Sequence, residues 1–405
     1  MPQFLIRLWA RIYFYLFIYN MKVLIIYPTL THPVNAGNKQ WALSQAKKLI
    51  QLGCDVYMLC INAPGLKETK EDVRKGLEET KRFWGDHVFV YNAGIVYRVK
   101  YTFMKHLRAI FNNGYYNCDD LYPQRLDIFV NKINKTQLFD VCIVNYYWLS
   151  KVLTKISIPT KVINTHDIFS FRDQVTHTKK AWMCTMPNEE AKALQRSDII
   201  LALQDEEAVF FSHLAPNSKV KVVYCPYEVH NTPLVGQHNL LMLASANELN
   251  IKGLEWFVED VFPLIIAVYP DVKLILGGYI CKAISNMIKH PNIVFIGSVQ
   301  DPMELYTMGD VAINPVYDGT GLKIKTFEAL SYGKIAMTHP HSVIGVYKKE
   351  ESGIFYSENP KEWVNFLGGI WDDYDKIQSL KQHSIEYINN MNSFIEMNYK
   401  SLMSM

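Results

Sequence analysis

The segment from Asn314 to Gly333, NPVYDGTGLKIKTFEALSYG, carries residues whose types and spacing point to chemistry. Gly319 and Gly321 allow the backbone to turn tightly and to approach a ligand closely. The helix expected after this loop would present unpaired N–H groups and the positive end of its dipole to an anion. Glu328 follows about two turns into that helix, where its carboxylate can accept hydrogen bonds from a pair of hydroxyl groups. An anion site followed by such a carboxylate indicates a nucleotide-binding site.

Two lysines strengthen this anion site. Lys323 and Lys325 lie between the glycines and Glu328 and add full positive charges. Together with the backbone N–H groups of the loop, which includes Thr320 and Leu322, they are candidates for binding a diphosphate. A second interpretation stays open, because Lys325 and Glu328 are three residues apart and could form an ordinary surface pair. Such a pair is worth only about 0.2–0.5 kcal/mol.

The segment resembles the donor-binding motif of GT-B glycosyltransferases, in particular the large retaining family usually numbered four. That motif has a Glu, seven further residues, and a second Glu followed by a small residue, with a Gly before the next strand. Glu328, Ala329 and Gly333 match its second half, whereas Thr320 stands where the first Glu would fall. The chain is therefore similar to a Gly-Thr-Gly-x-Lys variant of the motif, and the role of the first Glu is not carried over.

Composition limits the class of protein. A chain of 405 residues predicts two or three domains, and 49% hydrophobic with 20% charged residues is typical of a globular protein. The net charge of +3 is too small to indicate binding of nucleic acid. Seven cysteines without a C-x-x-C pair indicate reduced thiols in a cytoplasmic protein.

Residues 1–20 are apolar and aromatic, but Arg7 and Arg11 interrupt them. The uninterrupted stretch from Ile12 to Tyr19 is too short to span a bilayer, and no small-residue cleavage site follows it. Either Met21 is the functional start, which we favour, or this extension anchors the protein peripherally on the inner face of the membrane.

From Met21 onwards, short apolar runs alternate with helical patterns, which predicts parallel βαβ units. The expected strands cover residues 23–27, 56–60, 141–144, 162–164, 199–202 and 220–224, and then 240–244, 272–276, 293–296, 311–314 and 335–337. The stretch between Tyr224 and Leu240 has the Pro, Gly and Asn content of a linker.

We therefore predict an α/β protein of the GT-B type, with two Rossmann-like doubly wound domains facing a central cleft. Residues 21–228 would form the N-terminal, acceptor-side domain, and residues 229–372 the C-terminal domain that binds the nucleotide sugar. Residues 373–405 would form C-terminal helices that pack back towards the N-terminal domain.

Ligands of open α/β sheets bind beyond the carboxyl ends of the strands, so the residues after each strand are candidates. His166, Asp167 and Arg172 follow the strand at 162–164 in a Thr-His-Asp-x-x-Ser-x-Arg run. This run resembles the cleft loop of the N-terminal domain in the same glycosyltransferase subgroup. The resemblance implies that His166 and Asp167 act in catalysis by orienting donor sugar and acceptor. In the alternative, Asp167 caps a helix and His166 makes only local hydrogen bonds.

The acceptor side has three candidates, Arg172 together with Gly37 and Asn38 in the Gly-containing turn after the first strand. For Gly37, a plain turn is the alternative. The section from Tyr97 to Arg108 interleaves basic and aromatic residues, which suits an anionic membrane or a lipid-diphosphate acceptor if helical. A solvated helix that packs on its domain is the other interpretation.

The donor side has further candidates, which the resemblance implies. Ser245 and Lys252 belong to the loop and helix after the strand at 240–244, where the family holds the diphosphate, although the Arg common there is missing. Gly297 and Val299 end the strand at 293–296 and suit a nucleobase lying against backbone. A Gly at a strand end is, however, usually only a turn.

The resemblance implies a hexosyltransferase-like enzyme of surface polysaccharide synthesis. It would move a sugar from a nucleotide-diphosphate sugar to a saccharide or lipid-linked glycan acceptor, with retention of anomeric configuration. No metal and no cofactor is expected besides the nucleotide sugar as co-substrate. Lys323 would act in catalysis by stabilising the departing diphosphate. Two alternatives are a GT-B nucleotide-sugar epimerase and a catalytically silent nucleotide-binding module.

Overall fold

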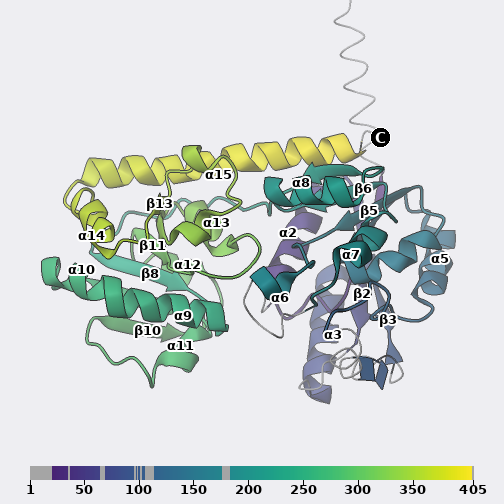
Figure 1. Cartoon of the computed structure of the whole chain (residues 1–405), viewed down its shortest axis with the longest axis horizontal. Helices are drawn as coiled ribbons and strands as arrows, with labels where there is room; N and C mark the ends of the chain where they lie inside the picture. Colours follow the sequence, from purple (N-terminus) through teal and green to yellow (C-terminus); the bar gives the residue numbers. More distant parts are fainter. Residues whose placement is uncertain are drawn as a thin grey trace, which may run out of the picture. The chain divides into compact units, whose positions relative to one another are not determined.

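The computed structural model describes residues 21–34, 37–63, 69–94, 114–175 and 183–403, with residues 97, 99, 100, 103 and 104 between them. The chain divides into two compact units (Figure 1). Unit 1 is Met1–Pro226 with Ile395–Met405, and unit 2 is Tyr227–Phe394. The predicted extension at 1–20, and most of the predicted basic helix at 97–108, lie outside the described residues. None of the described helices is both long enough and apolar enough to cross a membrane.

Unit 1 is built on a seven-stranded parallel sheet in the order β3-β2-β1-β4-β5-β6-β7. Its strands are β1 (Lys22–Tyr27), β2 (Asp55–Asn62), β3 (Val88–Asn92), β4 (Val141–Asn145), β5 (Thr160–Asn164), β6 (Ile199–Ala202) and β7 (Lys219–Val222). The central strands β1 and β4 are almost entirely buried, as expected for a parallel sheet covered on both faces. The order reverses between β1 and β4, which is where sheets of this type bind ligands.

Helices connect these strands. They are α2 (Gly37–Gln51), α3 (Lys70–Trp84), α5 (Leu126–Gln137), α6 (Arg172–Val175), α7 (Pro187–Leu194) and α8 (Asp205–Leu214), with the 3₁₀ turns η1 (Gly85–His87) and η2 (Tyr147–Thr154). The long C-terminal helix α15 (Tyr374–Met403) begins in unit 2 and ends in unit 1. Within unit 1, Tyr399 of α15 accepts a hydrogen bond from Gln45 of α2 at 3.1 Å.

Unit 2 has a six-stranded parallel sheet in the order β10-β9-β8-β11-β12-β13. Its strands are β8 (Asn239–Leu243), β9 (Lys273–Gly277), β10 (Ile293–Gly297), β11 (Val311–Asn314), β12 (Ile335–Thr338) and β13 (Phe355–Tyr356). Its helices are α9 (Glu248–Trp256), η3 (Phe257–Val261), α10 (Phe262–Val268), α11 (Ile280–Ile284), α12 (Met303–Tyr306), α13 (Ile324–Ser331), η4 (Pro340–Val343), η5 (Lys349–Glu351) and α14 (Pro360–Gly368). Here the order reverses between β8 and β11.

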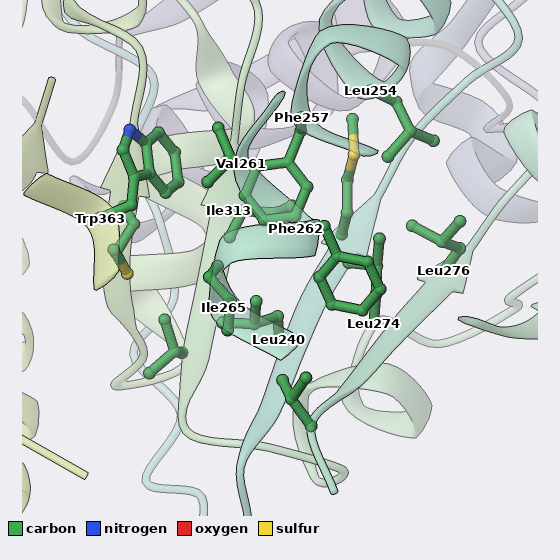
Figure 2. Close-up of a cluster of buried hydrophobic side chains, with 14 of the residues drawn as sticks. Leu240, Leu254, Phe257, Val261, Phe262, Ile265, Leu274, Leu276, Ile313 and Trp363 are labelled. Carbon is green, nitrogen blue, oxygen red and sulfur yellow. The ribbon is translucent and has the colours of Figure 1, made fainter. Parts of the chain in front are cut away.

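The core of unit 2 fixes the strands whose carboxyl ends carry the candidate donor residues. Figure 2 shows Phe257, Phe262 and Trp363 packed over Leu240 and Leu274 of the sheet. Trp363 is fully buried, and its indole Nε1 donates to the Ser357 carbonyl at 2.9 Å, so its polar atom is satisfied. This packing holds α9, η3 and α14 against one face of the sheet.

Helix α9 approaches the loop after β11 unusually closely. A Cβ atom on Gly253 would lie 2.8 Å from the Pro315 carbonyl oxygen and 2.9 Å from the Cα of Val316. Only glycine fits there. Gly253, the second residue of the Lys-Gly pair in α9, is therefore required for packing, independently of the role of Lys252.

Candidate functional site

A hydrogen-bonded network ties together the loops after β8 and β11, at the point where the strand order of unit 2 reverses. Asn250 of α9 donates from Nδ2 to the backbone carbonyl of Ser245 at 2.9 Å and to its Oγ at 3.1 Å. The side chain of Asn247 caps α9 by accepting from the Asn250 N–H at 2.8 Å. Asn250 Oδ1 in turn accepts from Lys325 Nζ. The structure thus brings predicted Ser245 and Lys325 together, through an asparagine that was not predicted.

The backbone carbonyls of the Gly-Thr-Gly loop bind the ammonium group of Lys323. Gly319 and Gly321 have φ of 98° and 76°, values that favour glycine. Lys323 Nζ donates to the carbonyls of Gly319 at 3.1 Å, Thr320 at 3.4 Å and Gly321 at 3.0 Å. His341 Nε2 also lies 2.7 Å from the Gly319 carbonyl oxygen. Lys323 therefore shapes the loop, a role that the sequence did not indicate.

One backbone N–H group that was predicted to donate to a phosphate already has a hydrogen-bond partner. The Gly319 N–H donates to the carboxylate of Asp318 at 2.6 Å. For the predicted role of this N–H, the Asp318 side chain would have to turn away when a diphosphate binds. Helix α13 begins at Ile324, next to Gly321 and Leu322, and directs the positive end of its dipole there. Two N–H groups of its first turn already have partners, because Ile324 donates to the Leu322 carbonyl and Thr326 to the Lys323 carbonyl, each at 3.1 Å.

Lys325 and Glu328 lie on the partly buried face of α13. Burial lowers the pKa of Lys325 to about 7, while the charge of Glu328 opposes this shift. Burial raises the pKa of the Glu328 carboxyl to about 7, and the charge of Lys325 opposes that shift. Lys325 binds Asn250 rather than Glu328, and the Glu328 carboxylate accepts no hydrogen bond from any residue in the described part of the chain. The surface-pair interpretation is therefore wrong.

The other donor-side candidates lie apart from this network. Lys252 is exposed and pairs with Glu248 at 2.8 Å, one turn earlier on α9. Gly297 closes β10 and accepts from the Gly278 N–H at 2.7 Å, which joins the ends of β9 and β10. The side chain of Val299 packs where a Cβ on Gly277 would lie, at 2.9 Å. Gly297 and Val299 thus mark the carboxyl end of β10, two strands from β8.

In unit 1, His166 sits at the carboxyl end of β5 in a left-handed conformation with φ of 68°. Its Nε2 lies 2.7 Å from Asn145 Oδ1, which also accepts from Asn164 Nδ2 at 2.9 Å. Because Asn145 Oδ1 only accepts, we assign the imidazole proton to Nε2. The ring stacks on Tyr146 with centroids 4.1 Å apart. Burial lowers the pKa of His166 to about 3, so this histidine is neutral at pH 7 and a poor general base.

Asp167 and Arg172 pair with each other in the same loop, with Nη2 and Oδ2 3.1 Å apart. Asp167 Oδ1 also accepts from the Ile168 N–H at 2.9 Å. The guanidinium of Arg172 lies 5.2 Å from the centre of the Phe169 ring. Since α6 starts at Arg172, Asp167 does not cap it. The structure thus pairs Asp167 with Arg172, whereas His166 hydrogen-bonds to Asn145.

Two buried glutamates that the sequence did not reveal lie near this loop, and Glu190 positions it directly. Glu190 of α7 accepts from the N–H groups of Phe169 at 3.0 Å and Ser170 at 2.9 Å, and from the Ser170 hydroxyl. Burial raises its pKa to about 7. Glu207 of α8 accepts from the Leu203 N–H at 3.0 Å, and burial and the charge of Asp167 raise its pKa to about 8. A glutamate on an expected helix gives no signal that separates such a residue from a solvated one.

The remaining acceptor-side candidates lie at the switch point of unit 1. Gly37 is the first residue of α2. Asn38 Nδ2 donates to the Tyr146 hydroxyl at 3.1 Å, which links the chain after β1 to the chain after β4. Within the described ranges, no three His, Cys, Asp or Glu side chains are grouped so that they could hold a metal ion.

Known proteins resemble this chain in part of its sequence and in its fold. Residues 237–373, which contain the network around Lys325 and Glu328, match the family model described as glycosyl transferases group 1. An uncharacterised 44.6 kDa protein of the cps region of Klebsiella pneumoniae is 28% identical over 116 residues, which are 26% of this chain and 29% of that protein. The chain therefore matches less than a third of the length of this curated relative.

Solved structures resemble nearly the whole chain. TarM from S. aureus, in a complex with fondaparinux, alpha-GlcNAc-glycerol and UDP, has a TM-score of 0.66 at 10% identity, over 95% of this chain and 100% of that one. The pneumococcal O-GlcNAc transferase GtfA, in complex with UDP and GlcNAc, gives 0.63 at 9% identity, over 95% and 99%. HepE from Anabaena, in complex with UDP and glucose, gives 0.59 at 14%, over 95% and 100%.

At these identities the likenesses establish the fold. The chain consists of two parallel α/β sheets with covering helices, in the manner of the GT-B glycosyltransferases. The predicted fold class, GT-B with two Rossmann-like doubly wound domains, is confirmed.

Proposed function

We propose that this protein is a glycosyltransferase that moves a sugar from a nucleotide-diphosphate sugar to a saccharide or lipid-linked glycan acceptor. The observation that carries the proposal is the partly buried Glu328 carboxylate, which accepts no hydrogen bond from the described residues although its burial costs free energy. It lies one turn from Lys325, at the switch point where doubly wound sheets bind nucleotides. Two hydroxyl groups of a ribose would supply the missing hydrogen bonds.

The two lysines of the site would bind the diphosphate, whose negative charge favours the protonated form of Lys325. Lys325 is held by Asn250, and Lys323 lies inside the Gly-Thr-Gly loop, next to the N-terminus of α13. These groups are fixed before the reaction, so they would stabilise the negative charge that grows on the diphosphate as the glycosidic bond breaks. With this neutralisation supplied by the protein, we propose a transfer that needs no metal ion, and we infer retention of configuration.

The neutral His166 and the Asp167–Arg172 pair would orient donor sugar and acceptor rather than exchange protons, because the pKa of His166 is about 3. The names of the relatives support a saccharide acceptor. TarM is described with alpha-GlcNAc-glycerol and UDP, GtfA as an O-GlcNAc transferase, and the Klebsiella relative by its cps region. We therefore propose a cytoplasmic role in surface polysaccharide synthesis, with peripheral membrane contact if the acceptor is lipid-linked.

The test is a transfer assay with a panel of radiolabelled UDP-, GDP- and ADP-sugars and saccharide acceptors, with and without EDTA. We expect label in the acceptor, unaffected by EDTA, and loss of at least tenfold in transfer by Glu328→Gln. Glu259→Gln is the matched control, because Glu259 is exposed on η3 of the same unit. An isomerised nucleotide sugar would indicate an epimerase, and binding without turnover would indicate a silent module. Either outcome would overturn the proposal.

A further inference from the structure

A hollow of about 540 Å³ in unit 2 is lined by Trp256, Tyr317, His339 and Glu358. Trp256 ends α9, and the other three residues follow β11, β12 and β13 at the carboxyl edge of the sheet. The volume lies within the range of about 300–1,000 Å³ that small-molecule sites occupy. None of these residues belongs to the network around Glu328.

Aromatic rings form steep walls of this hollow. The rings of Trp256 and His339 have centroids 5.4 Å apart at an interplanar angle of 89°, and those of Tyr317 and His339 are 5.9 Å apart at 60°. The ring of Trp256 also packs against the buried Trp363, with ring centroids 6.0 Å apart. Tyr317 remains 41% exposed. The walls are thus anchored to the core while at least one ring stays open to a ligand.

Apart from His339 Nδ1, the polar atoms of these four side chains have no hydrogen-bond partner in the described part of the chain. The Trp256 indole N–H, the Tyr317 hydroxyl and the Glu358 carboxylate make no hydrogen bond with any described residue. His339 Nδ1 accepts from the His341 N–H at 3.2 Å, so in the neutral ring the proton sits on Nε2, which has no partner either. The hollow therefore offers three donors and a carboxylate acceptor next to apolar ring faces.

The charges around the hollow disfavour an ionic ligand. The salt bridge to Glu248 raises the pKa of Lys252, and the nearby carboxylate of Asp318 adds to this effect. Burial lowers the pKa of His339, and the charge of Glu358 opposes this shift. An organic cation would meet the Lys252 ammonium, and an anion would meet the Glu358 carboxylate. A neutral molecule with many hydroxyl groups can accept a hydrogen bond from the Lys252 ammonium and donate one to the Glu358 carboxylate. The C–H faces of sugar rings also pack on aromatic rings.

We propose that this hollow binds a neutral saccharide, namely sugar units of the acceptor remote from the reacting end. That assignment of the occupant rests on the proposed transfer to saccharides, but saccharide binding in the hollow does not need a donor to be present. Ser342 Oγ donates to the Val316 carbonyl at 2.7 Å, next to Tyr317, so the ligand would contact a segment that already has a fixed conformation.

The test uses saturation-transfer NMR on the whole protein with maltotriose and chitotriose as neutral probes. We expect saturable binding of at least one probe, weakened about tenfold or more by Tyr317→Ala and by Glu358→Gln. Tyr279→Ala removes another exposed tyrosine of unit 2, 52% accessible, and should leave binding unchanged. Circular dichroism establishes that each variant is folded.

Absence of saturable binding by both trisaccharides would overturn the proposal, as would binding that Tyr317→Ala and Glu358→Gln leave intact. Binding of choline that Glu358→Gln abolishes would overturn it in favour of an organic cation. A parallel titration with UDP separates this proposal from the transferase proposal. Trisaccharide binding without UDP binding would contradict only the transferase function, and UDP binding without trisaccharide binding would contradict only the hollow.

Discussion

Glu328→Gln should raise the stability of the folded protein and lower its affinity for a nucleotide. The pKa of Glu328 rises from 4.5 to about 7 in the folded protein. At about 1.4 kcal/mol per pK unit, keeping this carboxyl ionised costs the fold about 3 kcal/mol. Glutamine has nearly the same shape and no charge to desolvate. The variant should therefore be more stable than the wild-type protein at a pH where Glu328 is ionised.

The pH dependence follows from the direction of the shift. Below pH 4.5 the carboxyl is protonated in both the folded and the unfolded chain, so the substitution should change the stability little. Between pH 4.5 and 7 only the unfolded chain releases this proton, so the wild-type protein loses stability as the pH rises. Above pH 7 the carboxyl is ionised in both states, so the stability of the wild-type protein falls no further through this group. At pH 8 the lost attraction to Lys325 matters little, because the pKa of that ammonium is itself about 7.

The same substitution should weaken nucleotide binding. A hydrogen bond to a charged group contributes about 1.5–3 kcal/mol, which is about a 10- to 150-fold change in dissociation constant. We expect Glu328→Gln to raise the melting temperature at pH 8 by about 2–4 °C for each kcal/mol gained and to reduce UDP affinity about tenfold or more. Differential scanning calorimetry and isothermal titration measure the two effects. Unchanged UDP affinity in the folded variant, or a lower melting temperature, would refute the reasoning.

Four further predictions concern the donor loop, the metal and the chain start. Gly319→Ala should destabilise the protein by about 1–3 kcal/mol, because its Cβ would lie 2.4 Å from Leu249 Cδ1 at a φ of 98°; an unchanged melting temperature would contradict this loop geometry. Lys323→Ala should lower kcat more than it raises KM, because the diphosphate gains charge in the transition state; a change in KM alone would leave Lys323 only its loop-holding role. Transfer should persist in EDTA, and strict dependence on Mn²⁺ would contradict the metal-free mechanism. A chain beginning at Met21 should keep full activity, whereas loss of vesicle binding would support an anchor at residues 1–20.

The sequence predicted the central strands well, because a strand buried on both faces leaves an uninterrupted apolar run. β1 and β4 are examples. β3, with the sequence VFVYN, was missed because it is only partly buried at the edge of its sheet. β13 was missed because two residues carry no periodicity. Strand detection thus depended on how completely each strand is covered.

The site could be predicted as far as topology determines it. Ser245 and Lys325 meet because parallel strands bring their carboxyl ends to one edge of the sheet. Asn250 escaped notice because its role depends on a contact with a residue 75 positions away. Glu190 escaped because burial of a helical carboxylate depends on tertiary packing. The side chain of Lys323 can bind the carbonyls of its own loop only because Gly319 and Gly321 have positive φ angles. Two glycines in a sequence permit such angles but do not require them.

The most direct test of the donor site is a crystal structure of the protein grown with UDP. We predict that the ribose hydroxyls donate to the Glu328 carboxylate and that the diphosphate lies at the N-terminus of α13, within reach of Lys325. A nucleotide bound elsewhere, or a Glu328 side chain still without a partner beside bound UDP, would contradict the account.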